Sequence, residues 1–158
     1  MVGTFGPLLH RHLSRMLPGD VDDVLQQTLV KAFRNLDRFR GDAKLSTWLY
    51  RIATNEALSH LRSQKRRSRW EVTGEDTAQL AGRVAADVYL DADEIQRALR
   101  SAIAELPAKQ RAVFTLRYFE ELPYREISEI TGTSEGALKA SYHLAAKKIE
   151  QKLKAYAD

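Results

Sequence analysis

The chain has 158 residues, of which 44% are hydrophobic and 29% are charged, with a formal net charge of +4 and no cysteine. This length allows one ordinary domain or two small ones, the missing cysteines exclude disulfides and thiol chemistry, and the basic balance favours nucleic acid or an anionic surface as a partner. Because no apolar run approaches the roughly 20 residues of a membrane helix and no secretion signal is visible, we expect a soluble cytoplasmic protein without membrane insertion.

Two helices are predicted before residue 40. Leu8 to Leu17 has the pattern of a short helix, closed by Pro18-Gly19. Between residues 21 and 36, apolar positions recur at spacings of three and four, which predicts a helix with one inward face. These positions are Val21, Val24, Leu25, Thr28, Leu29, Ala32, Phe33 and Leu36. Three aspartates stand at its start, where carboxylates suit the cap and the helix dipole: Asp20, Asp22 and Asp23.

A third helix, over residues 49–61, follows a polar loop at 39–44 that contains a glycine. The helix presents Arg51 and Asn55, and Asn55 could hydrogen-bond a base edge or brace the loop. A basic run follows, formed by Arg62, Lys65, Arg66, Arg67 and Arg69. Such a run often forms only a solvated surface. Because this run follows a helix that presents Arg51 and Asn55, binding of nucleic-acid phosphates is at least as good an interpretation. We interpret Trp48 as a core residue rather than a platform for unpaired bases.

The periodicity fades between residues 63 and 92, and Arg83 is the only basic residue between Trp70 and Glu94. The acidic residues from position 71 to position 94 are Glu71, Glu75, Asp76, Asp87, Asp91, Asp93 and Glu94. This composition indicates a mobile acidic linker.

Helical periodicity then returns. One apolar stripe consists of Ile95, Leu99, Ala102, Ile103 and Leu106. Pro107 opens the next helix, where its missing N–H costs nothing, and further core positions follow at Val113, Leu116 and Phe119. Since no segment alternates with period two, we predict an all-α protein with a flexible linker at 66–92 between an N-terminal module, residues 1–65, and a C-terminal module, residues 93–158. Both modules are small, so we expect each to gain stability from partners.

A helix-turn-helix is predicted near the end of the chain. A short helix from Pro123 to Thr131 precedes Gly132-Thr133, where glycine can adopt a left-handed conformation, and Ser134 can cap the longer second helix. The second helix would turn Ala137, Leu138, Ser141, Ala145 and Ile149 inward. Its outward face would carry Glu135, Gly136, Lys139, Ala140, His143 and Lys147. In this motif, residues near the start of the second helix reach base edges in the major groove, but the spacing equally fits a hairpin that only packs on its neighbour.

Several segments of the chain resemble a known protein family. Arg40 to Asn55 looks like the promoter-melting segment of extracytoplasmic-function sigma factors, and Asp22 to Phe33 is similar to the helix that these factors press on the polymerase clamp. Leu106 to Arg111 and the following helices look like their second domain. The run from Thr47 to Ala53 (Thr-Trp-Leu-Tyr-Arg-Ile-Ala) ahead of a helix-turn-helix is specific, and the resemblance covers nearly the whole chain except the linker.

The resemblance implies a protein without catalysis, metal or cofactor that binds core RNA polymerase, recognises the −10 and −35 promoter elements and promotes melting. It also implies an anti-sigma factor as partner. The N-terminal module would hold a flipped base and contact the −10 element through Asp42, Lys44, Thr47, Arg51, Asn55, Arg62, Lys65 and Arg66. The C-terminal module would contact the −35 duplex through Arg125, Ser134, Glu135, Gly136, Lys139, Ala140 and His143. Polymerase would bind Asp22, Asp23, Gln26, Gln27 and Lys31.

Three departures from the family pattern stand out. Relatives usually have a further helix before Phe5, so that either the native start lies upstream or the chain is a shortened member. Gln27 stands where relatives usually have Glu. Near Ser141, many relatives have an arginine that is missing here, so their promoter sequences do not transfer.

Three other functions compete. A sigma-like decoy would bind an anti-sigma factor and never touch DNA, but it would not need the basic run at 62–69 or the Arg51/Asn55 pair. A stand-alone helix-turn-helix repressor would need a dimer interface or a ligand domain, and no segment remains for either. An enzyme is disfavoured because no metal set of Cys and His, no glycine-rich phosphate loop and no nucleophile motif is visible.

Overall fold

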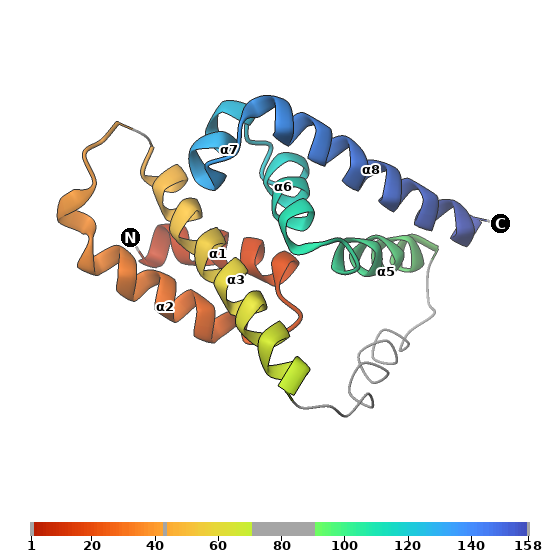
Figure 1. Ribbon diagram of the computed structural model, residues 1–158, viewed down its shortest axis with the longest axis horizontal. Coiled ribbons are helices and arrows are strands. Elements are labelled where there is room, and N and C mark those ends of the chain that lie inside the picture. The colour runs from red at the N-terminus through yellow and green to blue at the C-terminus, as the bar shows by residue number, and fades with distance from the viewer. Residues whose placement is uncertain (1, 43, 71–90, 158) are drawn as a thin grey trace.

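The structure is a computed structural model that describes residues 2–42, 44–70 and 91–157. Its regular elements within these ranges are all helices, which confirms the all-α prediction (Figure 1). The N-terminal module contains α1 (Val2–Met16), α2 (Val21–Arg34), a short 3-10 helix (Leu36–Arg38) and α3 (Leu45–Trp70). The C-terminal module contains α5 (Asp91–Ala104), α6 (Ala108–Tyr118), α7 (Tyr124–Thr131) and α8 (Glu135–Ala157). The larger part of the predicted acidic linker, residues 71–90, lies outside the described residues.

The helices of the N-terminal module differ from their predicted bounds. α1 begins at Val2 rather than at Leu8, and α3 continues as one helix through the basic run to Trp70. Asp20 precedes α2 with φ 62° and makes no side-chain cap, which corrects the capping role expected for it. Its carboxylate instead lies 3.1 Å from Nε2 of His60 and accepts a hydrogen bond of 3.1 Å from Gln64, so it ties the start of α2 to α3.

The predicted helix-turn-helix is confirmed in the C-terminal module. Gly132 ends α7 with φ 73°, a left-handed conformation that glycine adopts without steric cost. Ser134 Oγ accepts a hydrogen bond of 3.3 Å from the backbone N–H of Ala137, which caps the start of α8. Ile127 and Ile130 of α7 are buried, as their spacing predicts.

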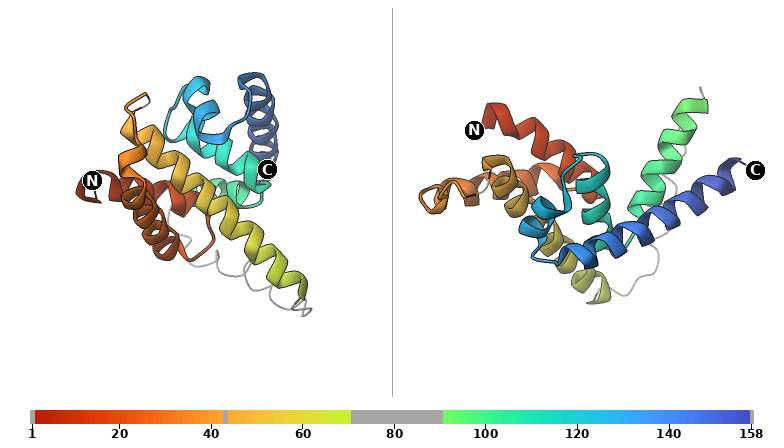
Figure 2. Two further views of the ribbon diagram at one scale, coloured as in Figure 1. Left: turned by 60° about the vertical axis from the view of Figure 1, so that its left-hand side comes forward. Right: turned by 90° about the horizontal axis from the view of Figure 1, so that it is seen from above.

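Two apolar clusters hold the helices together. One lies inside the C-terminal module and contains Ala102, Ile103, Leu106, Phe114, Ala145 and Ile149. The other joins both modules, since α7 packs on α3 and α6 packs on α1 (Figures 1 and 2). The modules are therefore packed against each other as one body, whereas the sequence indicated two separate units that depend on other partners for their stability.

Four residues that the periodicity placed inward are exposed: Phe33, Leu36, Ile95 and Ala137. Their helices are covered by neighbours on only part of their circumference, so an apolar stripe wider than the covered strip reaches solvent. For Phe33 the exposed fraction is 59%, the second largest among the exposed large apolar side chains of the described residues.

Candidate nucleic-acid interface

One side of α3 carries an exposed row of basic and polar side chains. Lys44 stands just before the helix, and Arg51, Asn55, Arg62 and Arg66 follow at intervals of seven and four residues, which places them on one helix face. All five are exposed. The spacing therefore gives α3 an exposed basic track along one side.

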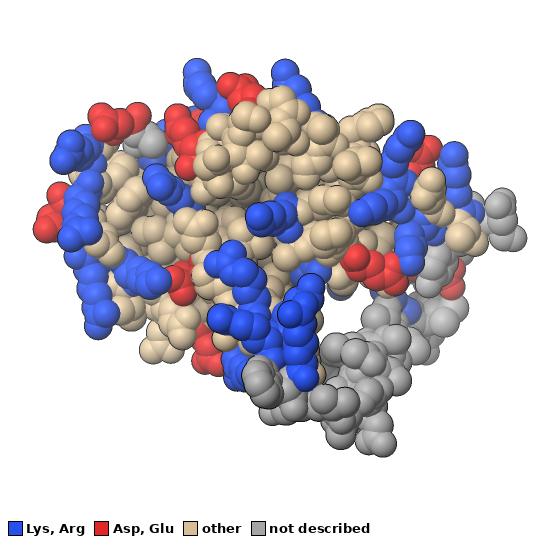
Figure 3. All heavy atoms as spheres, in the orientation of Figure 1, with Lys and Arg blue, Asp and Glu red and all other residues tan. Residues whose placement is uncertain are grey.

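The track is densest at the C-terminal end of α3. Here four side chains line an open hollow of about 320 Å³: Arg62, Lys65, Arg66 and Arg69. Figure 3 shows Lys and Arg side chains gathered over this end of the helix. Positive charge concentrated on an open, solvated surface suits phosphates rather than base edges, because it attracts any nucleic-acid backbone without reading its sequence.

The loop before α3 is braced by aromatic packing. The rings of Phe39 and Trp48 lie 5.3 Å apart, and Trp48 is partly buried against the shared core, as expected for it. Asp42 is exposed, but Thr47 is only 3% exposed. Thr47 thus departs from the predicted DNA-contacting set: its position on α3 faces the core, and in this conformation its hydroxyl cannot meet a base.

The residues predicted to face outward at the start of the second helix are exposed on the helix-turn-helix. Glu135, Gly136, Lys139, Ala140 and His143 of α8 are all exposed. Arg125 is exposed on α7, while the hydroxyl of Ser134 serves the cap of α8. Nζ of Lys139 lies 5.8 Å from the ring centroid of Tyr124, which restrains this ammonium near the start of the recognition helix. Carboxylate, ammonium and imidazole groups on one helix face can read donors and acceptors in a major groove.

A second exposed surface lies on α2. Asp22, Asp23, Gln26 and Gln27 are exposed, whereas Lys31 forms an ion pair with Glu56 of α3. Sequence reasoning missed the apolar part of this face, which consists of Val30, 42% exposed, and Phe33, 59% exposed. Gln26, Val30 and Phe33 follow at intervals of four and three, and of these three the periodicity placed only Phe33 on the inward face.

Sequence reasoning also missed the contacts between the modules. Tyr50 of α3 donates a hydrogen bond of 2.7 Å to Oε2 of Glu120, which follows α6, and Arg15 of α1 lies 3.3 Å from Oε1 of the same carboxylate. Burial and the hydrogen bond to Glu120 raise the pKa of Tyr50. Lys44 lies 3.2 Å from Glu126 of α7, so a predicted DNA-binding side chain is paired with the helix-turn-helix. These partners are distant in sequence, so the spacing of residues along the chain does not predict their contacts.

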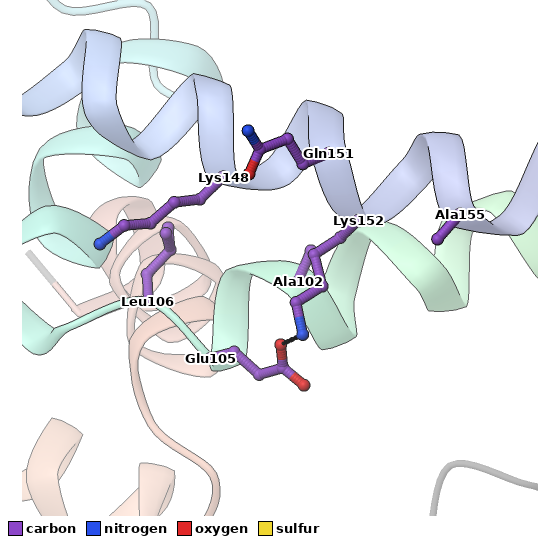
Figure 4. A pocket seen from close by; sticks show the side chains of 7 residues that line it. All are labelled: Ala102, Glu105, Leu106, Lys148, Gln151, Lys152 and Ala155. Atoms are coloured by element: carbon purple, nitrogen blue, oxygen red, sulfur yellow. Dashed lines mark ion pairs between the residues drawn. The ribbon is translucent and has the colours of Figure 1, made fainter.

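A groove of about 450 Å³ separates α5 from α8 (Figure 4). Its lining consists of Ala102, Glu105, Leu106, Lys148, Gln151, Lys152 and Ala155. The only ion pair drawn among them joins Lys152 to Glu105 across the groove, and nothing in the lining forms a nucleophile–base pair. The described residues hold no cluster of His, Cys, Asp and Glu that could bind a metal, and no described helix has the length and apolar character needed to cross a membrane.

Comparison with known proteins assigns both modules. The family model of Sigma-70 region 2 matches residues 1–67, and that of Sigma-70 region 4 matches residues 96–149. The ECF RNA polymerase sigma-E factor of Haemophilus influenzae is 35% identical over 153 residues, which cover 92% of this chain and 79% of that protein. The ECF RNA polymerase sigma factor SigW of Bacillus subtilis is 32% identical over 142 residues, covering 85% and 76%.

Solved structures share the fold. The sigma factor RpoE of Bartonella quintana, in complex with the anti-sigma factor NepR, matches with a TM-score of 0.76 at 23% identity, covering 97% of this chain and 94% of that one. CnrH in complex with the cytosolic domain of CnrY matches with a TM-score of 0.65 at 24% identity, covering 98% and 85%. The similarity extends over both modules in each case.

Proposed function

Because this chain belongs to the extracytoplasmic-function sigma factors of bacterial RNA polymerase, we propose that it reads the two promoter elements with the two surfaces described above. The protein is a sigma factor for transcription initiation. The observation that carries the division of labour is the presence, in one chain, of an exposed basic track on α3 and an exposed recognition face on α8. The sigma factor needs no catalytic activity of its own, because the polymerase performs the chemistry.

The track on α3 supports a role at the −10 element. Arg51, Arg62 and Arg66 contact the phosphates, and their charge supplies affinity that does not depend on sequence. Asn55 lies one turn after Arg51 and offers an amide that can donate to and accept from a base edge. An unstacked base costs a few kcal/mol, and hydrogen bonds in the loop ahead of α3 offset this cost.

The helix-turn-helix supports a role at the −35 element, which remains duplex. The N-terminal part of α8 enters the major groove, where Glu135 accepts a hydrogen bond from a cytosine amino group and Lys139 donates to guanine or to a phosphate. Arg125 on α7 contacts the backbone and sets the register. The base preference of this face depends on its own exposed side chains, Glu135, Lys139 and His143.

The exposed face of α2 supports binding to core polymerase. Its carboxylates and amides precede the exposed apolar residues Val30 and Phe33 on the same helix, and protein interfaces combine apolar and polar groups in this way. The relatives of known structure were solved with an anti-sigma factor or a cytosolic partner domain, and we propose an anti-sigma factor for this chain too. The protein then acts in the cytoplasm, where polymerase and DNA are.

Run-off transcription tests this function. Purified chain and core polymerase should initiate transcription from a subset of promoters in fragmented genomic DNA, and omission of either component should abolish the transcripts. A chain that binds core but initiates on no template is a decoy. A chain that binds one DNA sequence tightly without core polymerase is a repressor.

A further inference from the structure

A large apolar side chain lies exposed on the recognition helix. Leu144 of α8 is 50% exposed and belongs to neither of the two apolar clusters of the described residues. The side of α8 that packs on the other helices carries Leu138, Ala145 and Ile149, all of which are buried. With one turn in about 3.6 residues, Leu144 is turned by about 120° from the centre of this buried side. Packing within the described part of the chain therefore gives no reason for a leucine at this position.

Leu144 continues the helix surface that we assign to the major groove. Gly136, Ala140 and Leu144 follow at intervals of four residues, so they form one ridge along α8, and all three are exposed. Lys139 and His143 belong to the neighbouring ridge, one residue earlier at each turn. The exposed surface of the helix thus has a polar ridge, which can read hydrogen-bond donors and acceptors, beside an apolar ridge, which cannot.

The first two positions of the apolar ridge permit a close approach of the helix to base edges. Gly136 and Ala140 have the smallest side chains, so nothing long keeps the helix away from the floor of a groove. A β carbon added at Gly136 would meet no atom within 4 Å, and Gly136 does not have a positive φ. Since glycine destabilises a helix relative to alanine, its presence here is not explained by contacts among the described residues and suits the approach of a ligand.

The major groove offers one apolar partner for a leucine. Thymine presents a methyl group there, at C5, whereas the edges of the other three bases are recognised by their hydrogen-bond donors and acceptors. Contact between this methyl group and Leu144 removes apolar surface of both from water, which is favourable. A donor or acceptor placed against Leu144 would instead lose its water without gaining a hydrogen-bond partner. The exposed leucine therefore favours a thymine over any other base.

We propose that Leu144, together with Ala140, contacts thymine methyl groups of the −35 duplex, and that Leu144 thereby determines part of the base preference of α8. This inference rests on the proposed role of the helix-turn-helix at the −35 element. It adds an apolar contact to the hydrogen bonds of Glu135 and Lys139. The apolar contact depends on a single methyl group of the DNA and, unlike a contact between Lys139 and a phosphate, hardly depends on salt.

Replacement of thymine by uracil in promoter DNA tests this contact, because uracil keeps the hydrogen-bonding groups of thymine and lacks only the C5 methyl group. A promoter selected by run-off transcription is prepared with each thymine of its −35 element replaced in turn. The full chain bound to core polymerase should bind the uracil promoter about fourfold more weakly wherever one buried methyl group is lost. The ratio of the two affinities should be the same at low and at high salt.

Substitution of Leu144 should remove the sensitivity to uracil at the thymine that it contacts. Leu144→Ala should bind the thymine promoter as weakly as the wild type binds the uracil promoter, and the uracil replacement should then change its affinity little. Leu144→Met keeps a long apolar side chain and should retain most of the ratio. Lys139→Ala should weaken binding to both promoters alike, so that its ratio stays that of the wild type.

Ile95→Ala is the matched control for loss of an exposed apolar side chain. Ile95 is 60% exposed on α5, outside the surfaces that we assign to DNA, so this variant should keep the wild-type affinity for both promoters. Thermal unfolding and the helical circular-dichroism signal of Leu144→Ala should match those of the wild type, because half of the Leu144 side chain already meets water. A lost ratio in this variant would then reflect the missing contact and not misfolding.

Two results would overturn the reading of methyl groups by Leu144: equal affinity of the wild type for all thymine and uracil promoters, or a ratio that persists in full in Leu144→Ala. The proposed function fails separately, when no core-dependent transcript appears on any template. The comparison is then made with the chain alone on fragmented genomic duplexes. Uracil sensitivity that Leu144→Ala removes would there support the methyl contact and reject only the promoter role, whereas absence of any DNA binding would overturn both.

Discussion

The imidazole of His12 in α1 is fully buried, and its Nε2 lies 3.0 Å from Oγ1 of Thr54 in α3. Its Nδ1 has no hydrogen-bond partner among the described residues, and the ring meets that of Tyr50 edge-on with centroids 5.3 Å apart. Burial, with a smaller contribution from the charge of Arg15, lowers the pKa of His12 to about 3. The core of the N-terminal module therefore accommodates this histidine in its neutral form.

This burial predicts that the protein loses stability in mild acid. In the unfolded chain, His12 has a pKa of about 6.5, so between pH 6.5 and 3 the unfolded state binds a proton that the folded state does not. The contribution is fully present above pH 6.5 and declines as the pH falls. Urea unfolding at pH 7.5 and 5.5 should show this loss in the wild type and in His143→Ala, but a smaller loss in His12→Leu. Equal losses in all three would contradict the assignment.

Arg111→Met should destabilise the chain by about 3 kcal/mol, because it leaves carbonyls at the ends of α1 and α5 without their charged donor. Arg111→Lys should recover only part of this, since an ammonium cannot reproduce the planar set of donors. The exposed neighbour Lys109 provides the control, and Lys109→Met should stay within about 0.5 kcal/mol of the wild type. Denaturant titration measures all three. A loss below about 1 kcal/mol in Arg111→Met would show that water replaces the guanidinium.

Substitutions in the two predicted DNA-binding surfaces should impair different steps of initiation. Lys139→Ala should weaken binding to a duplex carrying the −35 element about tenfold and leave opening of a pre-bound promoter intact, because a groove contact of this kind contributes about 1–3 kcal/mol. Asn55→Ala should slow opening, followed by the chemical reactivity of unpaired thymines, and leave −35 binding unchanged. Equal loss of both steps in each variant would refute the division of labour.

Phe33→Ala should lower the affinity for core polymerase roughly tenfold, because burial of a phenylalanine side chain contributes about 1.5–3 kcal/mol to an interface. The thermal stability of the Phe33→Ala variant should hardly change, since the Phe33 side chain is 59% exposed in the free chain. Leu144→Ala, at a position 50% exposed on α8, is the matched control for an exposed apolar residue. Fluorescence titration of labelled chain with core gives both affinities. Unchanged affinity of Phe33→Ala would place the polymerase elsewhere.

The basic end of α3 should act through charge alone. Arg66→Gln should lower the slope of log affinity against log salt by about 0.9 for non-specific DNA, the amount expected for one lost phosphate contact. The reduction should be the same for promoter and non-promoter duplexes. Lys109→Gln, an exposed charge on the C-terminal module, should keep the wild-type slope. A sequence-dependent effect of Arg66→Gln would instead make this residue a base reader.

The sequence by itself determined the features that depend on near neighbours. Helical spacing, the left-handed Gly132 and the capping Ser134 act within about four residues, so the helix-turn-helix and the exposed track from Arg51 to Arg66 could be predicted. Only the tertiary structure decided which side of each helix is covered: Thr47 is buried and Phe33 is exposed although both lie on amphipathic helices. It also decided that Tyr50 meets Glu120, 70 residues away. The reason is physical: burial and long-range pairing are set by whatever packs against a helix, and the spacing along one helix carries no record of its neighbour.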